Sequence, residues 1–132
     1  MPQLATLPIS HRCLFMALLA MGCHAPISHA GADFSGFLAD FRHALAVNDG
    51  ARVAALTRLP FLYEGRGRDR AAFLAIYPQL FNAPVRRCLA RAQPIAEDGA
   101  QVIFCSPYAF YFRPVQGSWR LVEFAADGEA LP

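Results

Sequence analysis

Residues 101 to 113 read Gln101-Val-Ile-Phe-Cys-Ser-Pro-Tyr-Ala-Phe-Tyr-Phe-Arg113, and after Pro-Val-Gln-Gly117 residues 118 to 126 read Ser118-Trp-Arg-Leu-Val-Glu-Phe-Ala-Ala126. Two aromatic and β-branched runs around a short connection with Pro and Gly predict two antiparallel strands. Residues alternate with period two, which gives each strand two faces. The expected faces are Tyr108, Phe110 and Phe112 against Ala109, Tyr111 and Arg113, and Trp119, Leu121 and Glu123 against Arg120, Val122 and Phe124. Because such a ribbon is marginally stable alone, we expect upstream helices to cover it.

The first of these helices is predicted from an apolar stripe at helical spacing. The stripe consists of Phe34, Phe37, Leu38, Phe41 and Leu45. Asp33 is the expected N-cap, and Asn48-Asp49-Gly50 should end the helix with Gly50 in the left-handed conformation. A short second helix is expected over residues 51–59, where Asp49 can cap it and Pro60 stops it.

Further helices and strands follow from turn and capping residues. Residues 61–64 form a predicted strand and residues 65–68 a turn. Asp69 should cap a third helix from Arg70 to about Phe81, which Pro78 either kinks or splits. A fourth helix is expected from Asn82-Ala83-Pro84 onward, although residues 85–92 partly alternate and a strand is the alternative.

The predicted fold class is therefore α+β, with N-terminal helices packed on a curved antiparallel sheet. Residues 94–97 add a short strand, and Asp98-Gly99 is typical of a hairpin turn that requires positive φ.

The length of 132 residues indicates one domain. A net charge of +2 without a basic stripe argues against nucleic-acid binding. All 12 basic residues are Arg, which reflects either the codon usage of a GC-rich genome or a use of Arg in anion binding.

The N-terminus has the pattern of a targeting segment. A polar region with Arg12, an apolar run from Cys13 to Gly22 and the small residues around Ala30 predict a signal peptide over residues 1–30, followed by one domain over 31–132. The protein would then be periplasmic or secreted in a Gram-negative-type bacterium. The alternative is a lipoprotein, because Ala-Met-Gly-Cys23 resembles a lipobox. Only a lipid on Cys23 would then attach the protein to a membrane.

Two cysteines remain in the predicted mature chain, Cys88 and Cys105. In an oxidising compartment they are candidates for a disulfide. The alternative is a pair of buried free thiols that behave as small apolar side chains. No His and Cys residues have the spacing of a metal site, and we expect neither a metal nor a cofactor.

The order of helices and strands resembles the nuclear transport factor 2-like superfamily, also called the cystatin-like cone or SnoaL-type fold, in its exported bacterial form. The similar stretches are residues 37–50, 53–61, 72–77, 80–85 and 119–122. The resemblance implies a curved sheet around the first helices and a cone-shaped cavity. The expected lining of this cavity is Phe41, Tyr63, Tyr108, Phe110 and Trp119. The chain is short for this fold, so either a strand is missing or the cavity is shallow.

The fold implied by the resemblance serves both enzymes and binding proteins. Candidate catalytic residues are Asp40 and His43, three residues apart on the first helix, together with Tyr111. This spacing is common on helices, and a solvated helix edge is the interpretation that we favour for the pair. A cross-strand ion pair is expected between Arg113 and Glu123.

We expect a non-catalytic domain that binds a small apolar ligand or a protein partner. One alternative is a small isomerase, dehydratase or hydrolase with an acid–base group in the cone. Another is a periplasmic inhibitor or immunity-type protein. A homodimer is also compatible with this sequence.

Overall fold

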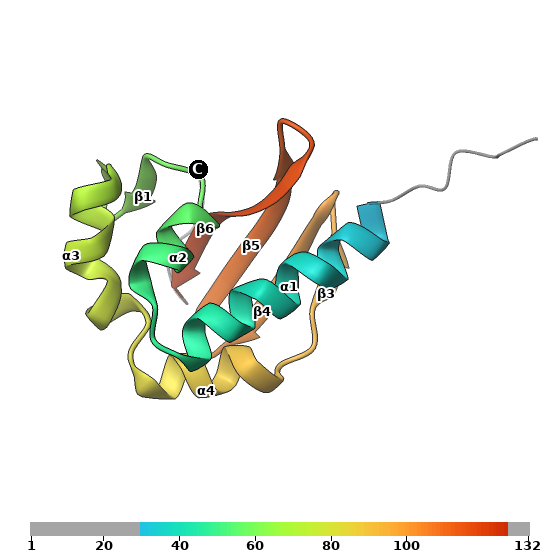
Figure 1. The fold of residues 1–132 in the computed structure, drawn as a ribbon, viewed down its shortest axis with the longest axis horizontal. Coiled ribbons are helices and arrows are strands. Elements are labelled where there is room, and N and C mark those ends of the chain that lie inside the picture. The colour runs from blue at the N-terminus through green and yellow to red at the C-terminus, as the bar shows by residue number, and fades with distance from the viewer. Residues whose placement is uncertain (1–29, 127–132) are drawn as a thin grey trace, which may run out of the picture.

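The structure is a computed structural model that describes residues 30–126, and in this range helices precede an antiparallel sheet of four strands (Figure 1). The elements are α1 (Ala30–Ala46), α2 (Gly50–Ala55), β1 (Phe61–Tyr63), β2 (Arg66–Arg68), α3 (Arg70–Leu80), α4 (Ala83–Arg91), β3 (Ile95–Glu97), β4 (Ala100–Cys105), β5 (Tyr108–Val115) and β6 (Ser118–Ala126). The four strands pair in the order β3-β4-β5-β6, and β1 and β2 form a separate hairpin. The predicted α+β class is confirmed. None of the described helices is long and apolar enough to cross a membrane. The predicted signal peptide and Cys23 lie outside the described residues.

The run over residues 101–113 contains two strands, so the prediction of a single strand was wrong. Strand β4 ends at Cys105 and β5 begins at Tyr108, and these two residues lie opposite each other in the register. Ser106 and Pro107 therefore form a two-residue turn. Because Pro has no N–H and restricts the residue before it, this dipeptide is better suited to a turn than to the middle of a strand.

A β-bulge changes the direction of the last strand's side chains. Tyr111 pairs with Glu123, whereas the next residue, Phe112, pairs with Leu121, so β6 has one extra residue at this point. As a result, Leu121 and Phe124 both pack in the core, although the alternation placed them on opposite faces. The alternation predicted for β6 is thus correct before the bulge and wrong after it.

Capping side chains begin three of the helices, as their sequences predict. Asp49 accepts a hydrogen bond from the backbone N–H of Arg52 at the start of α2, and Asp69 accepts one from that of Ala72 at the start of α3. Asn82 caps α4 in the same way, with Pro84 in the first turn. These bonds satisfy N–H groups that have no partner within the helix. The helical interpretation of residues 85–92 is thereby confirmed.

Other predicted boundaries differ from the structure. Helix α1 begins at Ala30, before the expected cap Asp33. The left-handed residue after α1 is Asn48, with φ of 55°, and Gly50 is instead the first residue of α2. Asn adopts this conformation more readily than most residues, because its short side chain bonds locally. Helix α3 continues through Pro78 without splitting, and only Glu64 and Gly65 form the turn between β1 and β2.

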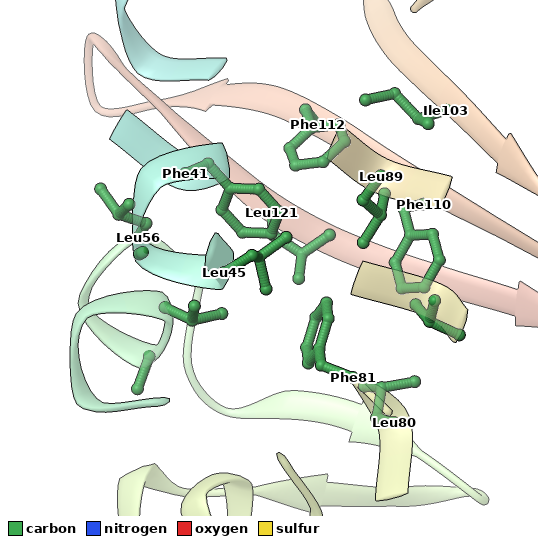
Figure 2. Close-up of a cluster of buried hydrophobic side chains, with 14 of the residues drawn as sticks. Phe41, Leu45, Leu56, Leu80, Phe81, Leu89, Ile103, Phe110, Phe112 and Leu121 are labelled. Atoms are coloured by element: carbon green, nitrogen blue, oxygen red, sulfur yellow. The ribbon is translucent and has the colours of Figure 1, made fainter. Parts of the chain in front are cut away.

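The core between the helices and the sheet is filled by aromatic rings. Phe41 of α1 lies 5.2 Å from Phe112 and 6.2 Å from Phe81 between ring centroids, and Phe81 lies 5.6 Å from Phe110. All four side chains are fully or almost fully buried, and Figure 2 shows them pointing toward one another together with Leu45 and Leu121. The predicted packing of α1 against the aromatic strands is confirmed, and rings occupy the centre of this interface.

A disulfide joins the last helix to the sheet. Cys88 of α4 and Cys105 of β4 are bonded, with their Cα atoms 5.8 Å apart. This confirms the predicted pairing. Disulfides persist in oxidising compartments, which supports a location outside the cytoplasm.

Arg42 on α1 provides a second link to α4. Its Nε donates to the carbonyl oxygen of Leu89 at 2.9 Å, and its Nη2 donates to that of Ala92 at 2.6 Å. Both carbonyls belong to the C-terminal end of α4, where helix carbonyls have no intrahelical partner and the dipole favours a cation.

We expect Arg42→Met to lower the free energy of unfolding by about 2 kcal/mol, because two charge-assisted hydrogen bonds are lost while the side-chain stem is kept. Urea denaturation measures the change. Arg87→Met on α4 is the matched control: Arg87 is exposed, and the change should stay within about 0.5 kcal/mol. Equal effects of the two substitutions would contradict the capping role.

Candidate functional site

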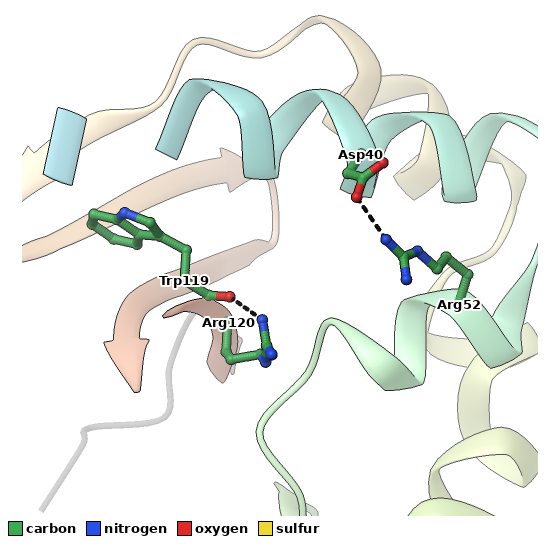
Figure 3. A network of polar contacts seen from close by, with 4 residues as sticks. All are labelled: Asp40, Arg52, Trp119 and Arg120. Atoms are coloured by element: carbon green, nitrogen blue, oxygen red, sulfur yellow. Dashed lines mark hydrogen bonds and ion pairs between the residues drawn. The ribbon is translucent and has the colours of Figure 1, made fainter. Parts of the chain in front are cut away.

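A surface groove of about 440 Å³ lies between α1, α2 and the hairpin of β5 and β6. It is lined by side chains from all three parts, among them Phe37, Asp40, Arg52, Ser118, Trp119 and Arg120. Figure 3 shows Asp40 and Arg52 facing each other from the two helices, with Trp119 and Arg120 on the neighbouring strand. The groove is therefore a meeting point of segments that are far apart in the sequence.

The groove holds one carboxylate and two guanidinium groups. Arg52 Nη2 donates to Asp40 Oδ2 at 2.6 Å, and these side chains are 50% and 55% exposed. Arg120 Nη1 donates to the backbone oxygen of Trp119 at 2.8 Å. An Arg side chain has five N–H donors, so each guanidinium can make further hydrogen bonds. The charged groups lining the groove give it a net positive charge.

Local sequence positions these groups. Asp49 caps α2 and so places Arg52 in the only full turn of that short helix, opposite Asp40. Gln116 and Gly117 both have positive φ, of 50° and 80°, as a tight hairpin turn between β5 and β6 requires.

Trp119 follows this turn, and its indole packs 4.8 Å from the ring of Phe34 on α1. Trp119 as a whole residue is only 9% exposed. One wall of the groove is therefore held in place by the core.

The structure does not bring the three candidate catalytic residues together. Asp40 is in the groove and paired with Arg52, whereas His43 is exposed in the last turn of α1 and does not line the groove. Tyr111 packs with Val102 and Ala109 on the sheet face opposite to the core. A catalytic acid or base must reach its partner within hydrogen-bond distance, directly or through a water. This arrangement lacks such a set among these residues.

The open face of the sheet that carries Tyr111 also carries exposed apolar side chains. Phe104 of β4 pairs with Ala109, and Ile95 of β3 pairs with Val102, so all four lie on this face. Phe104 is 50% exposed and Ile95 is 54% exposed.

The five residues expected to line a cavity lie in three different places. Phe41 and Phe110 are fully buried among other rings, and Trp119 lines the groove. Tyr63 and Tyr108 both pack against Phe124, at 5.8 and 5.0 Å between ring centroids.

Burial raises the pKa of the Tyr63 phenol above its ordinary value of 10.0. The charges of Glu64 and Tyr108 raise this pKa further, and the positive charge of Arg68 lowers it. The Arg68 guanidinium lies 5.7 Å from the centre of the Tyr63 ring. The contacts with Phe124 and Arg68 indicate a packing role for Tyr63.

The expected ion pair between Arg113 and Glu123 is absent from the described residues. Arg113 pairs in the register with Arg120, and its Nη1 donates to the backbone oxygen of Asp98 at 2.6 Å. The hairpin turn of β3 and β4 thus provides the acceptor. Glu123 lies opposite Tyr111 because of the bulge.

Sequence reasoning missed the two arginines of the groove. Neither Arg52 nor Arg120 belongs to a motif, and 68 positions separate them in the printed sequence. Only the packing of α2 beside the last hairpin places both in one groove. The absence of Lys from the chain was the one signal that could have directed attention to arginine.

Comparisons of this chain with protein-family models, with curated proteins and with solved structures found no match. Within residues 30–126, no group of three or more His, Cys, Asp or Glu side chains could hold a metal ion.

Proposed function

We propose that this protein is an exported, non-catalytic binding domain that recognises a protein partner in the groove between α1, α2 and the β5–β6 hairpin. The observation that carries the proposal is the combination of Trp119 with Arg52 and Arg120 in one open groove. Trp and Arg are the residues most enriched among those that dominate protein–protein binding energies. A periplasmic inhibitor would be one protein of this kind.

The chemistry of the groove favours a partner segment with an acidic side chain next to an apolar one. Two guanidinium groups face one carboxylate, so an incoming carboxylate meets a net positive charge. Phe37 and Trp119 supply apolar surface beside these charges. The ion pair of Asp40 and Arg52 is half exposed, so it contributes little to folding and can rearrange when a partner binds.

Two further expectations from the sequence support this proposal and belong with it. We infer that the helices and the four-stranded sheet are a short member of the nuclear transport factor 2-like superfamily, because the order of elements is similar. Rings such as Phe41 and Phe110 fill the centre, which favours recognition on the surface over a ligand inside a cone.

The disulfide supports a periplasmic or secreted location. An intact-mass measurement would distinguish cleavage after Ala30 from a lipid on Cys23.

Site-specific photo-crosslinking in the producing cells tests the proposal. A crosslinking amino acid at Ser118, on the rim of the groove, should capture one defined partner, whereas the same group at exposed Gln79 on α3 should not.

With that partner purified, we expect Arg120→Glu to weaken binding at least about tenfold, because the charge facing the partner is reversed. Arg70→Glu, an exposed Arg on α3, is the matched control. Equal capture from both positions, or an unchanged Kd for Arg120→Glu, would refute the proposal.

A further inference from the structure

A second hollow lies on another part of the surface, where α3 and α4 meet the start of α2. It has a volume of about 490 Å³ and adjoins a smaller one of about 260 Å³, with which it shares Asn48, Ala83 and Arg86. We call these two hollows together the Arg86 cleft. Its size falls within the range of pockets that hold small molecules, roughly 300–1,000 Å³.

The charge in the Arg86 cleft is entirely positive. Among residues 30–126, Arg86 and Arg87 are the only charged side chains that line it. In the described part of the chain the ion pairs are those of Arg52 and Arg68, so no carboxylate of this part forms an ion pair with Arg86 or Arg87. Asp49 does not line the cleft, although its charge raises the pKa of Tyr77. Its Oδ1 accepts the N–H of Arg52 at 2.9 Å. An anion entering the cleft would therefore meet a guanidinium that bonds to the neutral Tyr77 and to no described carboxylate.

Neutral hydrogen-bonding groups surround this guanidinium. Tyr77 is 5% exposed, and its hydroxyl donates to Asn48 Oδ1 at 3.1 Å. Burial raises the pKa of the Tyr77 phenol, while a hydrogen bond from Arg86 and its positive charge lower this pKa. Gly50 permits this close packing, because a Cβ there would lie 3.0 Å from the Tyr77 ring.

The rest of the wall is apolar. Leu74, Pro78 and Phe81 line the larger hollow, and the ring of Tyr77 lies beside them. Such a surface suits a hydrocarbon group better than water. The cleft therefore combines one cationic end with a wall for an apolar body.

We propose that the Arg86 cleft binds a small carboxylate that carries an apolar, ring-sized body. The planar guanidinium of Arg86 would hold the carboxylate through paired N–H···O bonds, a geometry for which Arg is particularly suited. The body would lie against Leu74 and Pro78, the accessible apolar side chains of the larger hollow. This site is separate from the groove that contains Trp119, so the inference does not depend on the protein partner proposed above.

Three probes test the inference with the disulfide-bonded chain by NMR titration. Phenylacetate has both the carboxylate and the ring, phenethylamine has a similar ring with a cation, and inorganic phosphate is an anion without a body. We expect phenylacetate to shift the amide signals of Ala83 and Asn48 in a saturable way. Phenethylamine and phosphate should leave these signals unchanged at the same concentrations.

Two substitutions on α4 complete the test. Arg86→Gln keeps helix propensity and should weaken phenylacetate binding at least about tenfold, because a charge-assisted contact is lost. Arg91→Gln, on the same helix but outside the cleft, should leave the Kd within about twofold, since no binding contact is removed. Unperturbed spectra of both free variants would show that they fold. Binding of phosphate or phenethylamine as tight as that of phenylacetate would overturn the inference, as would an equal loss in the two variants.

Discussion

Phe112→Ala should lower the free energy of unfolding by about 4 kcal/mol, the largest effect that we expect from a single side chain. Phe112 is fully buried, and its ring centroid lies 5.9, 5.7 and 5.2 Å from those of Phe34, Phe37 and Phe41. Truncation removes contacts with three rings of α1 and leaves a cavity between that helix and the sheet. The helix would lose much of what holds it to β5.

Urea denaturation followed by far-ultraviolet circular dichroism measures this change. Phe104→Ala is the matched control, because Phe104 is also a strand phenylalanine but is 50% exposed on the open face of the sheet. Its loss should cost about 1 kcal/mol or less. If Phe112→Ala does not fold, Phe112→Leu provides a milder version with the same ranking. Equal costs at positions 104 and 112 would contradict the packing of α1 on the inner face.

Removing the disulfide with Cys88→Ala and Cys105→Ala together should lower the free energy of unfolding by about 3 kcal/mol. The two residues are 17 positions apart, and the bond restricts the unfolded chain over this loop. It also joins α4 directly to β4. The loss should appear mainly as a lower melting temperature with unchanged secondary structure.

Thermal denaturation with and without a thiol reductant checks this expectation. Reductant should lower the melting temperature of the wild-type chain toward that of the double variant and should leave the double variant unchanged. The double variant is thus its own control for effects of the reductant on other parts of the chain. A reductant effect of the same size in both proteins would show that the bond between Cys88 and Cys105 does not stabilise the fold.

Local residue patterns predicted most of the helices and strands. The errors in the predicted faces of the strands come from contacts between segments far apart in the sequence. Asp49, Asp69 and Asn82 bond to backbone groups three residues away, so their capping roles can be recognised in the sequence. The bulge in β6 depends on how β5 pairs with it, and no local residue pattern indicates it. The expected face of Phe124 was wrong for this reason.

The candidate site shows the same limit. Asp40 and Trp119 were both identified from the sequence, but for other roles. Asp40 was expected to be an acid or base, and Trp119 was expected to line a cavity inside the cone. Their neighbours Arg52 and Arg120 come from other elements, and only the packing of those elements places them in the same groove. The Arg86 cleft likewise requires the start of α2 to lie beside α3 and α4.

Hydrophobic periodicity, caps and turn residues were enough to predict an α+β chain in which Phe41 and Leu45 face a sheet of aromatic strands, with Cys88 and Cys105 as candidates for a bond. These features depend on neighbours within a few residues or on the compartment alone. Tertiary packing decided the filled centre between the helices and the sheet, the bulge in β6, the groove that contains Trp119 and the Arg86 cleft. They depend on distances between elements far apart in the chain, which side-chain volumes and strand register set together.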